Sequence, residues 1–128
     1  MKKLEKYLHT NISSLEEYKA FQNAYIRYLK TLCQECGWEL CNIGRGHFYF
    51  SAFIKNQKGQ FVYLSIRDVR FFPNQWYYHI LIRRAEHERD YQGQMNHYAA
   101  LPTLQVGIDC LFQGLWAHKQ PKIYNQTF

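Results

Sequence analysis

The spacing of cysteine and histidine is the first feature of this sequence that suggests chemistry. Cys33 and Cys36 form a Cys-x-x-Cys pair, and Cys41 and His47 follow shortly after. Thiolates and an imidazole at such spacings can converge on a tetrahedral zinc ion. Against this, Cys36 falls on the apolar stripe of a predicted helix, and the spacing differs from the common zinc-finger patterns. We therefore expect reduced cysteines, no metal and no cofactor, with these four residues as the weaker zinc alternative.

Histidines close to carboxylates are the second candidate for chemistry. Three histidines and three acidic residues fall in one stretch of the chain: His79, Glu86, His87, Glu88, Asp90 and His97. A histidine beside a carboxylate can act as a proton shuttle. However, no nucleophile motif, phosphate-cradling glycine loop or metal-binding helix pair accompanies them. The sequence therefore predicts no catalytic site, and we expect that the protein is not an enzyme.

Aromatic and arginine side chains alternate with apolar ones from residue 61 to residue 84, FVYLSIRDVRFFPNQWYYHILIRR. Because side chains alternate with period two along a strand, one face of two strands is predicted to be core: Val62, Leu64, Ile66, Tyr78, Ile80 and Ile82. Rings and guanidinium groups on the other side favour contact with a partner. The predicted partner-binding residues are Tyr63, Arg67, Tyr77, His79, Arg83 and Arg84. The alternative is that residues 1–12, the loop at 91–98 or the tail covers these rings as a second small core.

Helix and strand patterns on both sides of this stretch supply the elements that must position it. Ser13 or Ser14 is predicted to cap a helix, because each is followed three residues later by a glutamate, and Gly37 ends that helix after about Cys36. Strands are predicted at 38–43, 47–55, 61–67 and 77–83, with a hairpin loop at 56–59. A second helix opens near Pro102 or Thr103. The remaining segments are predicted as a lead-in at 1–12, a long loop at 91–98 and a tail at 118–128.

These elements predict a single α+β domain over residues 1–128, with a folded core at 13–117. We expect two layers: an N-terminal helix, a three- or four-stranded antiparallel sheet, and a C-terminal helix, with both helices on the apolar sheet face. Over residues 13–117 the element order resembles that of the double-stranded RNA-binding domain. The resemblance implies a fold outline and carries no functional residues across, because Pro102-Thr103-Leu104-Gln105 stands where that family has a lysine cluster.

Charge and hydropathy narrow the class of partner. The chain has 16 Lys and Arg against 10 Asp and Glu, a formal charge of +6, which favours acidic partners. The charges are dispersed, which weakens the case for a dedicated nucleic-acid binder. The chain shows no apolar stretch of signal-peptide or membrane-spanning length, so we expect a cytoplasmic protein that does not bind membrane.

Two binding hypotheses follow from these residues. We favour a small non-enzymatic protein that binds another protein, a ribonucleoprotein or a second copy of itself as a dimer. The alternative is a nucleic-acid binder in which rings stack on bases and arginines meet phosphates. Compact, basic, motif-free chains of this size resemble the accessory proteins of phages and mobile elements, and this resemblance implies an inhibitor of a host defence system, of the anti-CRISPR type.

Overall fold

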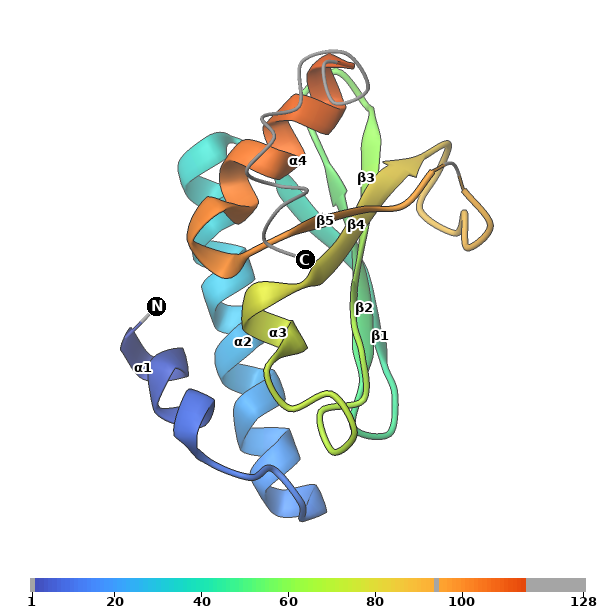
Figure 1. The fold of residues 1–128 in the computed structure, drawn as a ribbon. Helices are drawn as coiled ribbons and strands as arrows, with labels where there is room; N and C mark the ends of the chain where they lie inside the picture. Colours follow the sequence, from blue (N-terminus) through green and yellow to red (C-terminus); the bar gives the residue numbers. More distant parts are fainter. Residues whose placement is uncertain (1, 94, 115–128) are drawn as a thin grey trace.

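The computed structural model describes residues 2–93 and 95–114, which form a layer of helices packed on one antiparallel sheet (Figure 1). The helical segments are α1 (Lys2–Glu5), η1 (Lys6–His9), α2 (Leu15–Cys36), α3 (Gln75–Tyr78), η2 (Leu101–Thr103) and α4 (Leu104–Gln113). The strands are β1 (Glu39–Arg45), β2 (Phe50–Lys55), β3 (Phe61–Ile66), β4 (Ile80–Ala85) and β5 (His97–Ala99). Their order in the sheet follows their order in the chain. We call the sheet face toward the helices the inner face and the opposite one the outer face.

The long helix α2 has the boundaries that its sequence predicts. The Ser14 hydroxyl accepts a hydrogen bond from the backbone N–H of Glu17, and the Glu17 carboxylate accepts one from the backbone N–H of Ser14, which completes a capping box. Gly37 ends the helix in the left-handed conformation at φ 72°, where a side chain would be strained. One stripe of α2 is buried against the sheet: Tyr18, Phe21, Gln22, Tyr25, Ile26, Leu29, Leu32 and Cys33.

The predicted α+β class is confirmed, but the sheet has five strands rather than three or four. The additional strand is β5, which pairs antiparallel with β4 and overlaps the end of the stretch 91–98 that we predicted as a loop. Three residues are too few for a period-two pattern to show in the sequence. The predicted strand at 38–43 is present as β1, with a bulge between Cys41 and Gly44.

The prediction that the strand at 77–83 begins at Tyr77 is wrong. Residues Gln75–Tyr78 form a helical turn, and β4 begins at Ile80. Trp76 is thereby buried, whereas Tyr78, predicted to face the core, is 49% exposed. A single helical turn rotates successive side chains by about 100°, so the period-two assignment fails there. Ile80 and Ile82 do face the core as predicted.

The N-terminal segment contributes to the core, although the sequence showed only a charged lead-in. Leu4, Tyr7 and Ile12 are buried, and the Tyr7 ring lies edge-on to Phe21 with 5.3 Å between centroids. At the other end, α4 buries one apolar stripe of its sequence: Leu104, Ile108, Leu111 and Phe112. Leu115, Trp116 and the predicted tail at 118–128 lie outside the described residues.

The buried tyrosines of α2 are expected to make the folded state less stable at alkaline pH. Tyr25 is buried and its hydroxyl donates to the backbone carbonyl of Trp76 at 3.0 Å; burial above all, and then Tyr28, raises the pKa of Tyr25 well above 10. The folded state therefore keeps a proton that the unfolded state releases above pH 10. We expect the free energy of unfolding to fall above pH 10 by about 1.4 kcal/mol per pH unit for each such tyrosine.

Urea denaturation between about pH 8 and pH 11, the range in which unfolded tyrosine titrates, measures this slope. In the Tyr25→Phe variant the free energy of unfolding is expected to fall less steeply above pH 10, by the contribution of one tyrosine, about 1.4 kcal/mol per pH unit. At neutral pH it should be about 1 kcal/mol less stable, because the Trp76 carbonyl loses its donor. A slope as steep as that of the wild type in Tyr25→Phe contradicts the assignment.

Candidate functional site

The outer face of the sheet is divided into two halves. The strand register aligns Cys41, Phe53, Tyr63 and Arg83 in one row across the sheet. The next row, nearer the start of β2, contains Gly44, Ser51, Ser65, Leu81 and Tyr98. The first row lies under the loop Glu86–Gly93 and we call it the covered half. The second row, with the adjoining Tyr49, Arg67 and His79, we call the open half.

The covered half is a second small core. Phe53 has no exposed surface, and Tyr91 packs its ring edge-on to Phe53, with 5.4 Å between centroids, and to Tyr63, with 6.0 Å. In Figure 1 the chain after β4 turns to the side of the sheet away from the helices. The loop therefore buries Phe53 and leaves Tyr63 only partly exposed, as the alternative interpretation of the sequence anticipated for the region around Tyr91.

Arg83, on the outer face of β4, anchors this loop to the sheet. Its side chain lies over the Tyr63 ring at 4.4 Å from the centroid and is only 3% exposed. The two terminal guanidinium nitrogens donate to the backbone carbonyls of Arg84, at 3.2 Å, and Asp90, at 2.6 Å. Desolvating a cation is costly, and these charge-assisted bonds with the ring offset that cost. Arg83 thus acts as a structural anchor in this state of the protein.

The loop is also organised from within and held from β1. The Asp90 carboxylate accepts backbone N–H bonds from Glu86 and Gly93, both at 2.8 Å, and these bonds are the main reason that the pKa of Asp90 is lowered. From β1, the Asn42 side-chain amide donates to the Glu88 carbonyl and to the Tyr91 hydroxyl. The loop is therefore an ordered cover fixed at several points.

Two further predicted partner-binding residues lie away from the outer face. Arg84 pairs with Val62 in the register, so it lies on the inner face, where its guanidinium donates to the Leu111 carbonyl of α4 at 3.0 Å. Tyr77 lies on α3 and packs partly buried against the core. It is also near Tyr28, whose pKa is raised by burial and, to a smaller extent, by Glu35 and Tyr77. The structure therefore does not bring all six predicted residues together.

Small side chains flanked by rings form the open half. Ser51, Ser65 and Leu81 lie side by side and partly exposed in the centre. At one side the ring of Tyr98 stacks on that of His79, with centroids 4.0 Å apart. At the other side Tyr49 is 52% exposed. A strip of small and aliphatic side chains between larger rings is suited to receiving side chains of a partner.

Arg67 is the exposed cation of the open half. Its guanidinium stacks on the Phe72 ring at 3.7 Å from the centroid, and one nitrogen donates weakly to the Gln75 side chain at 3.4 Å. Stacking fixes the plane of the guanidinium and leaves its edge for in-plane recognition. Burial, and secondarily the Arg67 charge, lowers the pKa of His79, so this imidazole is neutral at pH 7. The open half therefore carries little positive charge.

The candidate zinc ligands are not assembled into a metal site. All four cysteines are free thiols, and the described residues contain no group of three or more His, Cys, Asp or Glu side chains placed to hold a metal ion. Cys33 is buried in the core while His47 is exposed in the turn between β1 and β2. Burial is the largest cause that raises the pKa of the Cys33, Cys36 and Cys41 thiols, which disfavours the thiolate form that zinc requires.

Tyr98 belongs to this surface but was missed from the sequence. It joins the open half because β5 places it opposite Leu81, and β5 was predicted as loop. The composition of residues 91–98 is mostly polar, and the two tyrosines at its ends, Tyr91 and Tyr98, give no periodic pattern. The contact between Tyr98 and His79 depends on strand pairing that only the folded chain contains.

Fold and site together define a class of protein: a two-layer α+β domain with a five-stranded antiparallel meander, one half of whose outer face is covered by a loop of its own. No protein-family model matches this chain, and neither a curated protein nor a solved structure matches it. The resemblance of element order to the double-stranded RNA-binding domain does not extend to the strand number, which is five here. No helix in the described part of the chain is long and apolar enough to cross a lipid bilayer.

Proposed function

We propose that the protein is a small non-enzymatic binding protein that acts through protein–protein contact, and that the open half is its contact surface. The observation that carries this proposal is the use of Arg83 and Arg84 in hydrogen bonds within the molecule. These were two of the three arginines available to meet phosphates. Arg67 is the one of the three that stays exposed, so the surface is mainly aromatic and aliphatic with a single cation, as protein interfaces are.

Direct binding of nucleic acid through this face is correspondingly disfavoured. Affinity for nucleic acid depends on several cations that neutralise phosphates, and the Tyr63 ring already packs against the Arg83 guanidinium and the Tyr91 ring. A ribonucleoprotein contacted through its protein part remains compatible with the proposal. An inhibitor of a host defence system, of the anti-CRISPR type, is one such binding protein, and this more specific role stays a prediction.

The Leu81→Lys variant tests the proposal, because it places a long charged side chain in the centre of the open half. A protein co-purified with the wild type is first purified and shown to bind directly by calorimetry. We expect Leu81→Lys to weaken that binding at least about tenfold, because a buried unpaired charge costs more than 1.4 kcal/mol. Val106→Lys is the matched control, since Val106 is exposed on α4, and it should bind like the wild type.

Two results would reject the proposal. Equal binding by Leu81→Lys and the wild type removes the open half as the contact surface. Tight binding to short RNA or DNA that falls steeply as salt rises supports the nucleic-acid alternative. Light scattering decides whether the partner is a second copy: a monomer at high protein concentration leaves a foreign protein as the partner.

A further inference from the structure

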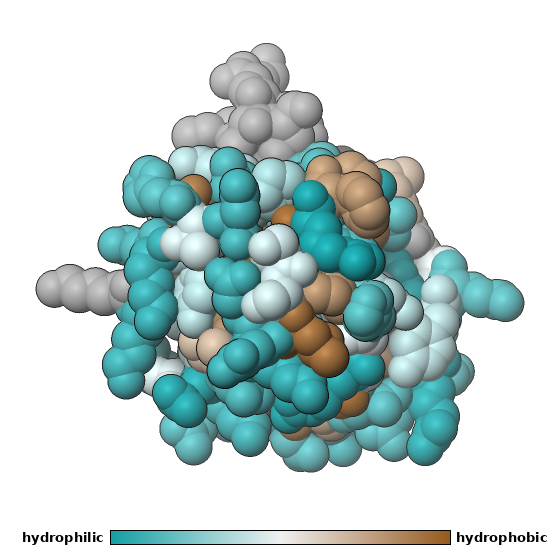
Figure 2. All heavy atoms as spheres, turned by 90° about the horizontal axis from the view of Figure 1, so that it is seen from below, coloured by the Kyte–Doolittle hydropathy of each residue, from teal (hydrophilic) through white to brown (hydrophobic). Residues whose placement is uncertain are grey.

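The end of the molecule where α2 begins carries a groove beside the open half, and Tyr49 adjoins both. Figure 2 views this end and shows a mainly hydrophilic surface with separate small hydrophobic patches. Between α2 and the turn after β1 lies a groove of about 340 Å³, lined by Leu15, Tyr18, Lys19, Gln22, Asn23, Arg45 and Gly46. This groove contains two cations, and none of the described residues that line it is acidic.

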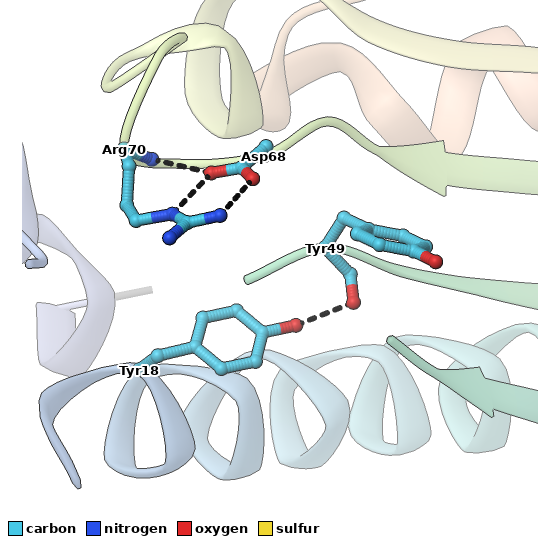
Figure 3. A network of polar contacts seen from close by, with 4 residues as sticks. All are labelled: Tyr18, Tyr49, Asp68 and Arg70. Carbon is cyan, nitrogen blue, oxygen red and sulfur yellow. Dashed lines mark hydrogen bonds and ion pairs between the residues drawn. The ribbon is translucent and has the colours of Figure 1, made fainter. Parts of the chain in front are cut away.

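Two of the carboxylates near this end are already used within the molecule, whereas Glu16 lies exposed beside Leu15 on α2. Glu17 accepts hydrogen bonds from the N-terminal cap of α2, and Asp68 forms a bidentate ion pair with Arg70 at 2.8 Å. Figure 3 shows Arg70 turned toward Asp68. No ion pair involves Lys19 or Arg45 in the part of the chain that the structure describes; neutral amides of Gln22, at 3.1 Å, and Asn23, at 3.4 Å, accept from Arg45.

Hydrogen bonds connect the walls of the groove. The Tyr18 hydroxyl donates to the Tyr49 carbonyl at 2.6 Å (Figure 3). The same hydroxyl accepts from the Gln22 amide at 2.9 Å, and Gln22 in turn accepts from Arg45. This chain of hydrogen bonds fixes the turn after β1 on α2. Gln22 is buried, and both the nitrogen and the oxygen of its side-chain amide are bonded. The oxygen that accepts from the Arg45 guanidinium is therefore held in place before any ligand arrives.

Apolar surface flanks the two cations. Leu15 is 46% exposed at one side, and the exposed ring of Tyr49 lies against Gly46 at the other, so closely that a Cβ on Gly46 would be 2.3 Å from the ring. Tyr49 is also part of the open half, so the groove and the open half are neighbouring parts of one surface. A ligand that fits here has an acidic group between aliphatic or aromatic groups.

We infer that this groove binds an acidic side chain of an amphipathic segment in the partner protein. This inference rests on the proposed function and names the chemistry of the partner. A carboxylate between Lys19 and Arg45 gains two charge-assisted bonds, while its apolar neighbours cover Leu15 and Tyr49. A protein segment fits better than nucleic acid because two cations beside exposed apolar groups match alternating acidic and apolar residues, not a continuous line of phosphates.

Three fluorescent probes test the inference by anisotropy on the full chain. One is a peptide on the order of twelve residues in which Glu and Leu alternate, one is the same peptide with Gln for Glu, and one is an oligouridylate of similar length. We expect the Glu peptide to bind at least about tenfold more tightly than the Gln peptide. Lys19→Glu should abolish that preference, and Arg45→Gln should reduce it. Lys30→Glu, an exposed change of equal charge farther along α2, should preserve it.

Each other outcome overturns the inference. Equal binding of the Glu and Gln peptides would show that the groove does not recognise a carboxylate. If the oligouridylate binds more tightly than the Glu peptide and Lys19→Glu abolishes that binding, the groove binds nucleic acid instead. An equal loss in Lys30→Glu shows that only the net charge of the protein matters. Failure here is distinguishable from failure of the proposed function, because Leu81→Lys tests the open half independently of Lys19 and Arg45.

Discussion

Replacing Trp76 with alanine is expected to lower the free energy of unfolding by about 3–5 kcal/mol, a large share of the roughly 5–15 kcal/mol of a typical domain. Trp76 is 1% exposed, and its ring lies edge-on to Phe21 at 5.2 Å and to Tyr25 at 6.1 Å between centroids. The substitution leaves a cavity at the junction of α2, α3 and the sheet. It also removes part of what positions the α3 backbone, whose carbonyl at residue 76 accepts from the Tyr25 hydroxyl.

Chemical denaturation of purified variants measures this effect. Tyr78→Ala is the matched control on the same helical turn, because Tyr78 is half exposed, and it should cost less than about 1 kcal/mol. Trp76→Phe is expected to cost about 1 kcal/mol, since phenylalanine fills less space but eliminates an indole N–H that has no acceptor among the described residues. A loss below 1 kcal/mol in Trp76→Ala would show that α3 does not close the core.

Replacing Arg83 with methionine is expected to release the loop Glu86–Gly93 and to destabilise the protein by about 2–3 kcal/mol. Methionine keeps the apolar length of the side chain but loses both donors and the cation over Tyr63. The desolvation cost of burying the guanidinium is recovered, which holds the net loss below the sum of the two hydrogen bonds. Phe53 should then become exposed to solvent, and Tyr63, which is already partly exposed, should become more so.

Denaturation and amide hydrogen exchange together test this second result. We expect faster exchange confined to the loop and to Asn42, whose side chain binds the Glu88 carbonyl. Arg89→Met, in the same loop, should behave like the wild type because Arg89 is exposed. Gly93→Ala should share the loop phenotype, since a Cβ there would meet the Arg83 guanidinium. Unchanged exchange and stability in Arg83→Met would contradict the anchoring role.

Local patterns in the sequence were sufficient where one segment decides its own structure. The serine and glutamate of the capping box and the glycine after Cys36 determine both ends of α2, because these interactions span only a few residues. The hairpin between β2 and β3 and the inward rows of both strands follow from turn chemistry and alternation. The turn at Gln75–Tyr78 was not predictable, because burial of Trp76 against α2 overrides the strand propensity of its aromatic neighbours.

The sequence by itself determined the fold class, the long helix, and the residues of β3 that face inward and outward. The tertiary structure alone decided which of the outward residues can meet a partner. Arg83 and Arg84 are adjacent in the chain but lie on opposite sheet faces, and each is bonded to a carbonyl brought near by folding, of Asp90 and of Leu111. Exposure depends on contacts between distant segments, which alternation along one strand does not contain.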